Sequence, residues 1–136
     1  MSRRLARETA LQVLYQVDVT GDKSDIEAAL KKWGEEFAVP QNGLAFAHNL
    51  VRGTLEFREQ IDERLNGLAK GWSTERMATV DRNLLRLAAY EILYCNDIPD
   101  KVSVNEAIEL AKSFGGQDST KFVNGILDQL IANREK

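Results

Sequence analysis

The sequence predicts an all-helical protein of about seven helices, organised as a single domain over residues 1–136. Apolar residues recur at helical spacing through most of the chain, and no alternating strand pattern of useful length occurs. Strong helix formers are abundant, and there are only two prolines. A chain of 136 residues is long enough to bury a core within one domain, and it contains no internal repeat.

The first predicted helix, residues 3–19, combines an apolar side with a group of arginines. Five apolar residues fall on one side: Ala6, Ala10, Val13, Leu14 and Val17. Arg3, Arg4 and Arg7 occupy a neighbouring arc, which is either a solvated charged face or a site for phosphate. Cations at a helix N-terminus oppose the macrodipole slightly, so three of them favour a purpose beyond helix stability.

Two helices are predicted in the middle of the chain before residue 70. Ser24 and Glu27 have the spacing of a capping box, and an apolar stripe follows them at Ile26, Leu30, Trp33 and Phe37. A linker over residues 40–43 precedes a long helix predicted from about 44 to 69. Gly53 lies inside this helix and indicates a bend or a close helix crossing.

The next segment predicts a short turn and then a central helix. Gly71 interrupts the pattern, residues 73–78 suit one helical turn, and a helix starts near Thr79 or Val80. This helix is apolar over more than half of its circumference, which is typical of a helix buried on several sides. Asp81 lies near its start, where a carboxylate interacts favourably with the helix dipole.

The last third of the chain predicts two helices joined by a glycine turn. Ser103 and Glu106 have capping-box spacing, and Gly115 and Gly116 are expected to end the helix in the left-handed conformation. Asp118 or Ser119 is expected to cap the next helix. The turn therefore crowds together several polar and aromatic residues: Phe114, Asp118, Ser119, Lys121 and Phe122.

This turn has the residue types of a phosphate and base site. Free N–H groups at a helix start suit an anion, and Ser119 and Lys121 add further donors. Phe114 and Phe122 are suited to stacking an unpaired base, as in single-stranded RNA recognition, or to packing in the core. The sequence leaves both interpretations open, and it does not place the first helix beside this turn.

Composition excludes several function classes. There is no phosphate-binding glycine loop, no HExxH motif and no Cys/His cluster around the single His48 and the single Cys95, so no enzyme, metal or cofactor is expected. The net charge of −3 means that any nucleic-acid site must be local. The lone cysteine, with neither a signal peptide nor a membrane-spanning stretch, predicts a cytoplasmic protein with no membrane partner.

Three stretches resemble the NusB family of transcription antitermination factors. They are RRLARETALQVLYQ (residues 3–16), VDRNLLRLAAYEILY (80–94), and NEAIELAKSFG followed by KFVNGILD (105–128). The resemblance implies two packed three-helix groups. It implies binding to the single-stranded boxA element of ribosomal RNA and some phage operons, together with the ribosomal protein NusE. The heterodimer is expected to join RNA polymerase, NusA and NusG and to oppose termination.

The resemblance also implies roles for particular residues. Those expected at the RNA are Arg3, Arg4 and Arg7 of the first helix, with Phe114, Gly115, Asp118, Lys121 and Phe122 of the turn. Asp81 matches an acidic position that faces NusE. Only two residues precede Arg3, so we expect weak RNA binding alone and tighter binding with NusE. A homodimer is possible, and the sequence does not decide between monomer and dimer.

Two alternatives remain at this point. Similar domains precede some ribosomal RNA cytosine methyltransferases, but the chain ends at Lys136 with no catalytic half, so a full enzyme is not expected. The other alternative is a helical adaptor that docks proteins without specific RNA binding. The arginine arc is the feature that argues against it.

Overall fold

The computed structural model describes residues 3–68, 71 and 73–134, and within them it contains seven α-helices and no strand. The helices are α1 Arg3–Thr20, α2 Ile26–Glu36, α3 Gln41–Glu56, α4 Arg58–Asn66, α5 Thr79–Tyr94, α6 Asp100–Phe114 and α7 Ser119–Ala132. A short 3₁₀ turn, η1, covers Thr74–Arg76. This confirms the predicted all-helical fold, the short turn and the start of the central helix.

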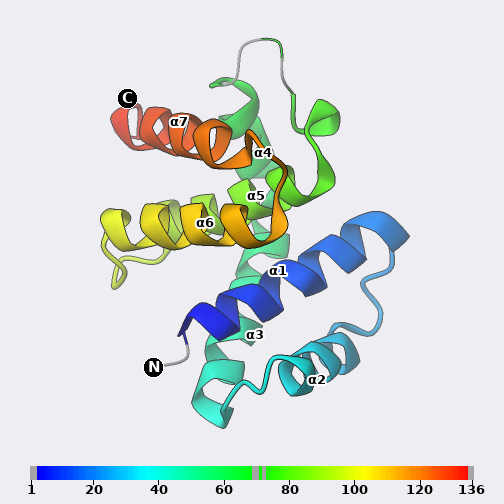
Figure 1. The fold of residues 1–136 in the computed structure, drawn as a ribbon. Helices are drawn as coiled ribbons and strands as arrows, with labels where there is room; N and C mark the ends of the chain where they lie inside the picture. The colour runs from blue at the N-terminus through cyan, green and yellow to red at the C-terminus, as the bar shows by residue number, and fades with distance from the viewer. Residues whose placement is uncertain (1–2, 69–70, 72, 135–136) are drawn as a thin grey trace.

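α5 is the central helix of the fold. It packs against α1, α3, α4, α6 and α7. Every residue from Asn83 to Ile92 is buried, as its broad apolar surface predicts. Figure 1 shows α1, α2 and α3 gathered on one side of the molecule and α6 and α7 on the other.

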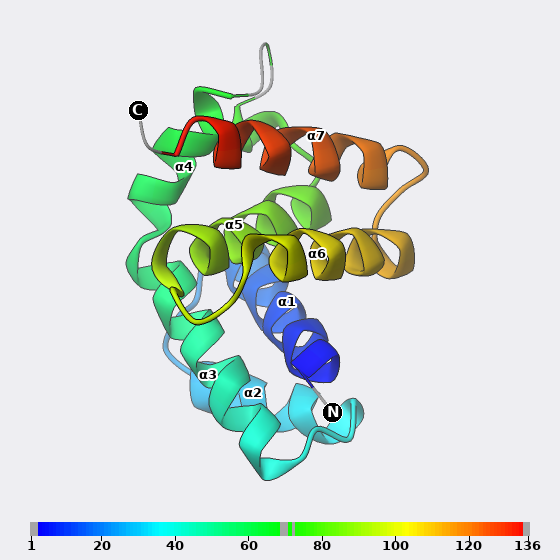
Figure 2. The same ribbon diagram turned by 90° about the vertical axis from the view of Figure 1, so that its left-hand side faces the viewer.

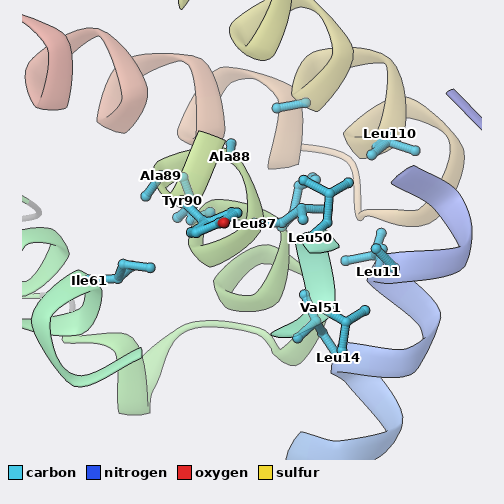
Figure 3. Packing of buried hydrophobic residues seen from close by; sticks show 14 of the residues in the cluster. Leu11, Leu14, Leu50, Val51, Ile61, Leu87, Ala88, Ala89, Tyr90 and Leu110 are labelled. Atoms are coloured by element: carbon cyan, nitrogen blue, oxygen red, sulfur yellow. The ribbon is translucent and has the colours of Figure 1, made fainter. Parts of the chain in front are cut away.

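One hydrophobic cluster includes residues from all seven helices. Figure 3 shows part of it, with side chains from α1, α3, α4, α5 and α6 pointing toward one another. Its labelled members are Leu11, Leu14, Leu50, Val51, Ile61, Leu87, Ala88, Ala89, Tyr90 and Leu110.

No helix in the described part of the chain is long and apolar enough to cross a membrane.

The predicted long helix over residues 44–69 is wrong, because Phe57 divides it into α3 and α4. Phe57 has φ −101° and ψ 14°, outside helical values. Its ring stacks on Tyr94 with 4.1 Å between ring centroids. Helical periodicity does not reveal this break, because the apolar spacing continues through Phe57 to Ile61 and Leu65. Ala69, the predicted last residue, lies outside the described residues.

Both predicted capping boxes are also wrong. α2 begins at Ile26 and α6 at Asp100, and neither has a side-chain cap hydrogen bond. The Ser24 N–H and hydroxyl instead donate to Asp22. Glu27 accepts from Arg52 at 2.9 Å and lies 2.7 Å from the His48 ring nitrogen Nε2. Ser103 and Glu106 of α6 are likewise used in contacts between helices, described below.

The glycine turn after α6 does not use the left-handed conformation that was predicted. Gly115 has φ −89° and ψ −177°, which other residues also adopt. The lack of room for a side chain explains better why residue 115 is a glycine. A Cβ there would lie 2.8 Å from the Ala111 carbonyl oxygen and 2.6 Å from the Ser119 hydroxyl oxygen. The turn is therefore too tight for a side chain at Gly115.

Gly53 marks a close helix crossing, which was one of its two predicted roles. A Cβ at this position would collide with the Tyr90 ring of α5. We expect Gly53→Ala to lower the free energy of unfolding by about 1–3 kcal/mol through overpacking. Urea unfolding followed by circular dichroism measures this change.

Gly125 of α7 provides the matched control for Gly53→Ala. A Cβ there would meet no described atom within 4 Å. Gly125→Ala should raise the free energy of unfolding by about 0.5–1 kcal/mol, because alanine is the better helix former. Equal effects of the two substitutions would contradict the assigned crossing.

Candidate nucleic-acid interface

Arg3 and Arg4 form the accessible part of the predicted arginine arc. The Arg3 guanidinium lies over the Phe46 ring, with 4.2 Å from Cζ to the ring centroid, a cation–π geometry. The Arg4 side chain is 52% exposed. Its Nε and Nη2 donate to the two carboxylate oxygens of Glu106 on α6, at 2.9 and 2.7 Å. These hydrogen bonds and the charge of Glu106 raise the pKa of Arg4.

Arg7, which was expected at the RNA with Arg3 and Arg4, lies beneath the surface in the structure. Its side chain is only 3% exposed. It donates from Nε and Nη2 to Glu91 of α5, at 2.9 and 2.7 Å. The Ser103 hydroxyl of α6 donates to the same carboxylate at 2.9 Å. Arg7 therefore holds α1 against α5, and its Nε and Nη2 donors are occupied by Glu91.

The arginines line a surface hollow of about 630 Å³ between the start of α1 and the start of α6. Its lining is Arg3, Arg4, Arg7, Asp97, Ile98, Pro99, Val102 and Glu106. The sequence does not indicate Phe46 as the ring beneath Arg3, because no local pattern links residues so far apart in the chain. The sequence also predicts Glu106 in a capping box, although its acidic charge and partly exposed helix face suit an arginine partner equally well.

The glycine turn forms a second hollow, of about 410 Å³. Its lining is Met77, Ala78, Asp81, Gly116, Asp118, Ser119 and Phe122. The Ser119 hydroxyl is buried; it donates to Asp81 at 2.6 Å and accepts from the Gly116 N–H at 2.8 Å. Asp81, expected at a protein partner, thus lies in the same hollow as residues expected at RNA.

The remaining turn residues differ in accessibility. Lys121 and Asp118 are exposed, and Asp118 occupies the cap position of α7 without a side-chain cap hydrogen bond. Phe114 and Phe122 are half-buried and pack against the core. The Phe114 ring meets Phe37 edge-on, with 6.4 Å between centroids. Each phenylalanine therefore combines a packed part with an accessible part.

α6 connects the two hollows. Arg4 binds Glu106, and Phe114 ends the same helix eight residues later, a rise of about 12 Å along the axis. Figure 2 shows the start of α1 next to α6, with the turn to α7 at the far end of α6. The structure thus places the start of α1 beside α6 at Glu106, and not directly beside the glycine turn. Among the residues described, no group of three or more His, Cys, Asp or Glu side chains could hold a metal ion.

The fold and this site define a small all-helical protein with exposed arginines at the start of α1 and half-buried aromatic residues around the turn between α6 and α7. The family model described as the NusB family matches residues 4–132. The chain belongs to the NusB family, and curated relatives that match it over its whole length are named transcription antitermination proteins.

Two relatives named transcription antitermination protein NusB show the extent of the similarity. The protein from Desulfitobacterium hafniense is 57% identical over 136 residues, which are all of this chain and 92% of the relative. The protein from Desulforamulus reducens is 50% identical over all of this chain and 94% of its own.

Solved structures share the fold. A structure described as T. maritima NusB is 38% identical and has a TM-score of 0.88, covering 98% of this chain and 92% of that one. A structure described as the antitermination factors NusB and NusE in complex with dsRNA is 28% identical. Its TM-score is 0.84, and 96% of each chain is covered.

Proposed function

We propose that this chain binds boxA RNA together with the ribosomal protein NusE. In this role it joins RNA polymerase, NusA and NusG in the cytoplasm and helps transcription to pass terminators. The family membership and the related NusB–NusE complex with RNA support this assignment. The observation that carries it is the pair of exposed arginines at the start of α1, of which Arg4 contacts α6, the helix that leads into the glycine turn.

The residues divide the work as follows in this proposal. Arg3, Arg4 and Lys121 hold phosphates, because their cationic groups are exposed. The accessible parts of Phe114 and Phe122 stack unpaired bases.

The tight turn at Gly115 and the exposed Asp118 shape the site between these aromatics. Asp81 is the group that faces NusE, and its hydrogen bond from Ser119 couples the NusE side to the RNA side. Arg7 acts through position, by holding α1 in place.

A second candidate is a helical adaptor that docks NusE without specific RNA binding. The observation that favours it is charge neutralisation, because Glu106 and Glu91 already pair with Arg4 and Arg7. RNA preference in the presence and absence of NusE separates the two functions. A homodimer that covers the arginine hollow would also suppress RNA binding, and light scattering of the same samples reveals it.

We expect Arg3→Ala to weaken binding of a labelled boxA RNA about fivefold, by roughly 1 kcal/mol, since it removes one phosphate partner. The slope of log affinity against log salt concentration should become shallower by about 0.7. Fluorescence anisotropy at several salt concentrations measures both quantities, with a scrambled RNA and a duplex as controls for sequence and strandedness.

The matched control is Lys31→Ala, which removes one exposed positive charge from α2. It should leave RNA affinity unchanged. If Arg3→Ala and Lys31→Ala bind boxA equally well, Arg3 does not contact RNA. If the unmodified protein shows no boxA preference with or without NusE, the adaptor function replaces the RNA-binding one.

A further inference from the structure

The ion pair between Arg4 and Glu106 has the geometry that a phosphate needs. Glu106 accepts from both Nε and Nη2 of Arg4, so the carboxylate occupies the two-donor edge of the guanidinium. This is one of the edges that arginine uses to bind phosphate through two parallel hydrogen bonds. The carboxylate and an RNA phosphate are therefore alternative partners for the same donors.

The charges around this pair reinforce the competition. Glu106 also lies 3.9 Å from Nη1 of the buried Arg7, and Asp97 lines the same hollow. Glu8 and Glu109 add further negative charge near Arg4. The arginine hollow is thus close to electrically balanced before any RNA arrives.

Glu106 is ionised at neutral pH. Hydrogen bonds from Arg4 lower the pKa of Glu106, and the charges of Arg4 and Arg7 act in the same direction against its partial burial. Its side chain is 18% exposed, against 52% for Arg4, so the carboxylate is the more fixed member of the pair. Arg4 is the member that is free to turn outward.

We infer that Glu106 is an internal competitor for Arg4 and sets the RNA affinity of the free protein. An RNA phosphate that binds this edge of Arg4 has to displace the carboxylate, so Glu106 keeps binding weak until other contacts are added. The inference rests on the proposed RNA-binding function and extends it to the control of affinity. It identifies Glu106 as an affinity-determining residue that does not itself bind RNA.

The test is Glu106→Gln, which keeps the size of the side chain and one acceptor oxygen while removing the charge. We expect boxA affinity to rise about fivefold at low salt and the salt slope to steepen by about 0.7, as for one additional phosphate contact. Glu59→Gln is the matched control, because it removes the same charge from an exposed position on α4. It should change neither quantity.

A double variant shows whether the gain passes through Arg4. In an Arg4→Ala background, Glu106→Gln should no longer raise the affinity for boxA RNA, because the guanidinium for which Glu106 competes is absent. Circular dichroism unfolding of each variant checks that the helices remain intact. Anisotropy of the four proteins forms a complete double-mutant cycle.

The outcomes distinguish this inference from the function on which it rests. If the unmodified protein prefers boxA but Glu106→Gln weakens binding or leaves it unchanged, the inference is overturned and the proposed function stands. An equal gain with and without Arg4 would also overturn it, because the effect would then be general electrostatics. If no protein in the cycle binds boxA, with or without NusE, the proposed function itself fails.

Discussion

Replacing Arg7 by alanine is expected to lower the free energy of unfolding by about 3–5 kcal/mol. The substitution leaves the Glu91 carboxylate buried, at 2% side-chain exposure, without its cationic partner. Of the described side chains, the Ser103 hydroxyl alone continues to donate to it. A buried charge without its partner loses far more than the modest net value of an exposed ion pair. Urea unfolding at neutral pH measures the loss.

The control is Arg3→Ala on the same helix. Arg3 is exposed, so its replacement should change stability by no more than about 0.5 kcal/mol. The double variant Arg7→Met with Glu91→Met should be more stable than the sum of the single losses, because it removes both charges together. A loss below about 1 kcal/mol for Arg7→Ala would contradict the buried pair.

This expectation changes how RNA-binding experiments on Arg7 are interpreted. Because Arg7→Ala removes the ion pair that holds the start of α1, we expect it also to shift Arg3 from Phe46 and Arg4 from Glu106. A loss of RNA affinity in that variant therefore reports the position of α1 and not a phosphate contact. Arg3→Ala is the cleaner probe, since its side chain is exposed.

Asp18→Ala is expected to destabilise the protein by a similar amount, about 3–5 kcal/mol. Asp18 lies near the end of α1 and accepts from three side chains of α5. Arg82 donates from Nε at 2.6 Å and from Nη2 at 3.1 Å. Asn83 donates at 2.7 Å, and Arg86 at 3.3 Å. The substitution removes the carboxylate that accepts all of these hydrogen bonds. Among the described residues, Arg86, with 6% of its side chain exposed, then keeps Asp62 as its one ionic partner. Thermal and urea unfolding measure the loss.

Asp18 also predicts the direction of the pH dependence. Burial alone would raise the pKa of Asp18, but hydrogen bonds from Arg82 and Asn83 and the charges of Arg82 and Arg86 outweigh it and lower the pKa. The carboxylate therefore contributes its stability above the unfolded-state pKa of about 3.9 and loses it as the pH falls toward the lower native value. In Asp18→Ala, the free energy of unfolding should therefore fall less steeply as the pH is lowered through the acid range. An unchanged slope between the two proteins would contradict the role of Asp18.

Local pattern determined most of the helices. The spacing of apolar residues predicts α1 nearly to its observed ends and α5 from its first residue, because a 3.6-residue period depends only on neighbouring positions. The same reasoning identified α5 as central, since a helix that is apolar over most of its surface has to be covered on several sides. Gly53 was recognised as a bend or a crossing, and the Tyr90 ring decides for the crossing.

Tertiary structure decided which polar residues are accessible. Arg3, Arg4 and Arg7 look equivalent in the sequence, yet Arg7 is buried in an ion pair with Glu91. The sequence does not predict this pair, because the two residues are 84 positions apart in the chain. Ser103 and Glu106 have capping-box spacing, but Ser103 instead donates to Glu91 of α5 and Glu106 accepts from Arg4 of α1. Local spacing carries no information about partners that distant.

The sequence by itself therefore determined the helical fold, the family resemblance and the set of residue types around a phosphate or base site. Only the tertiary structure separated surface from interior within that set and placed α1 beside α6. The physical reason is that helix formation is governed by contacts within a few residues. The burial of an arginine depends instead on whether the fold places a carboxylate from a distant part of the chain beside it. That placement leaves Arg3 and Arg4 at the surface and Arg7 beneath it.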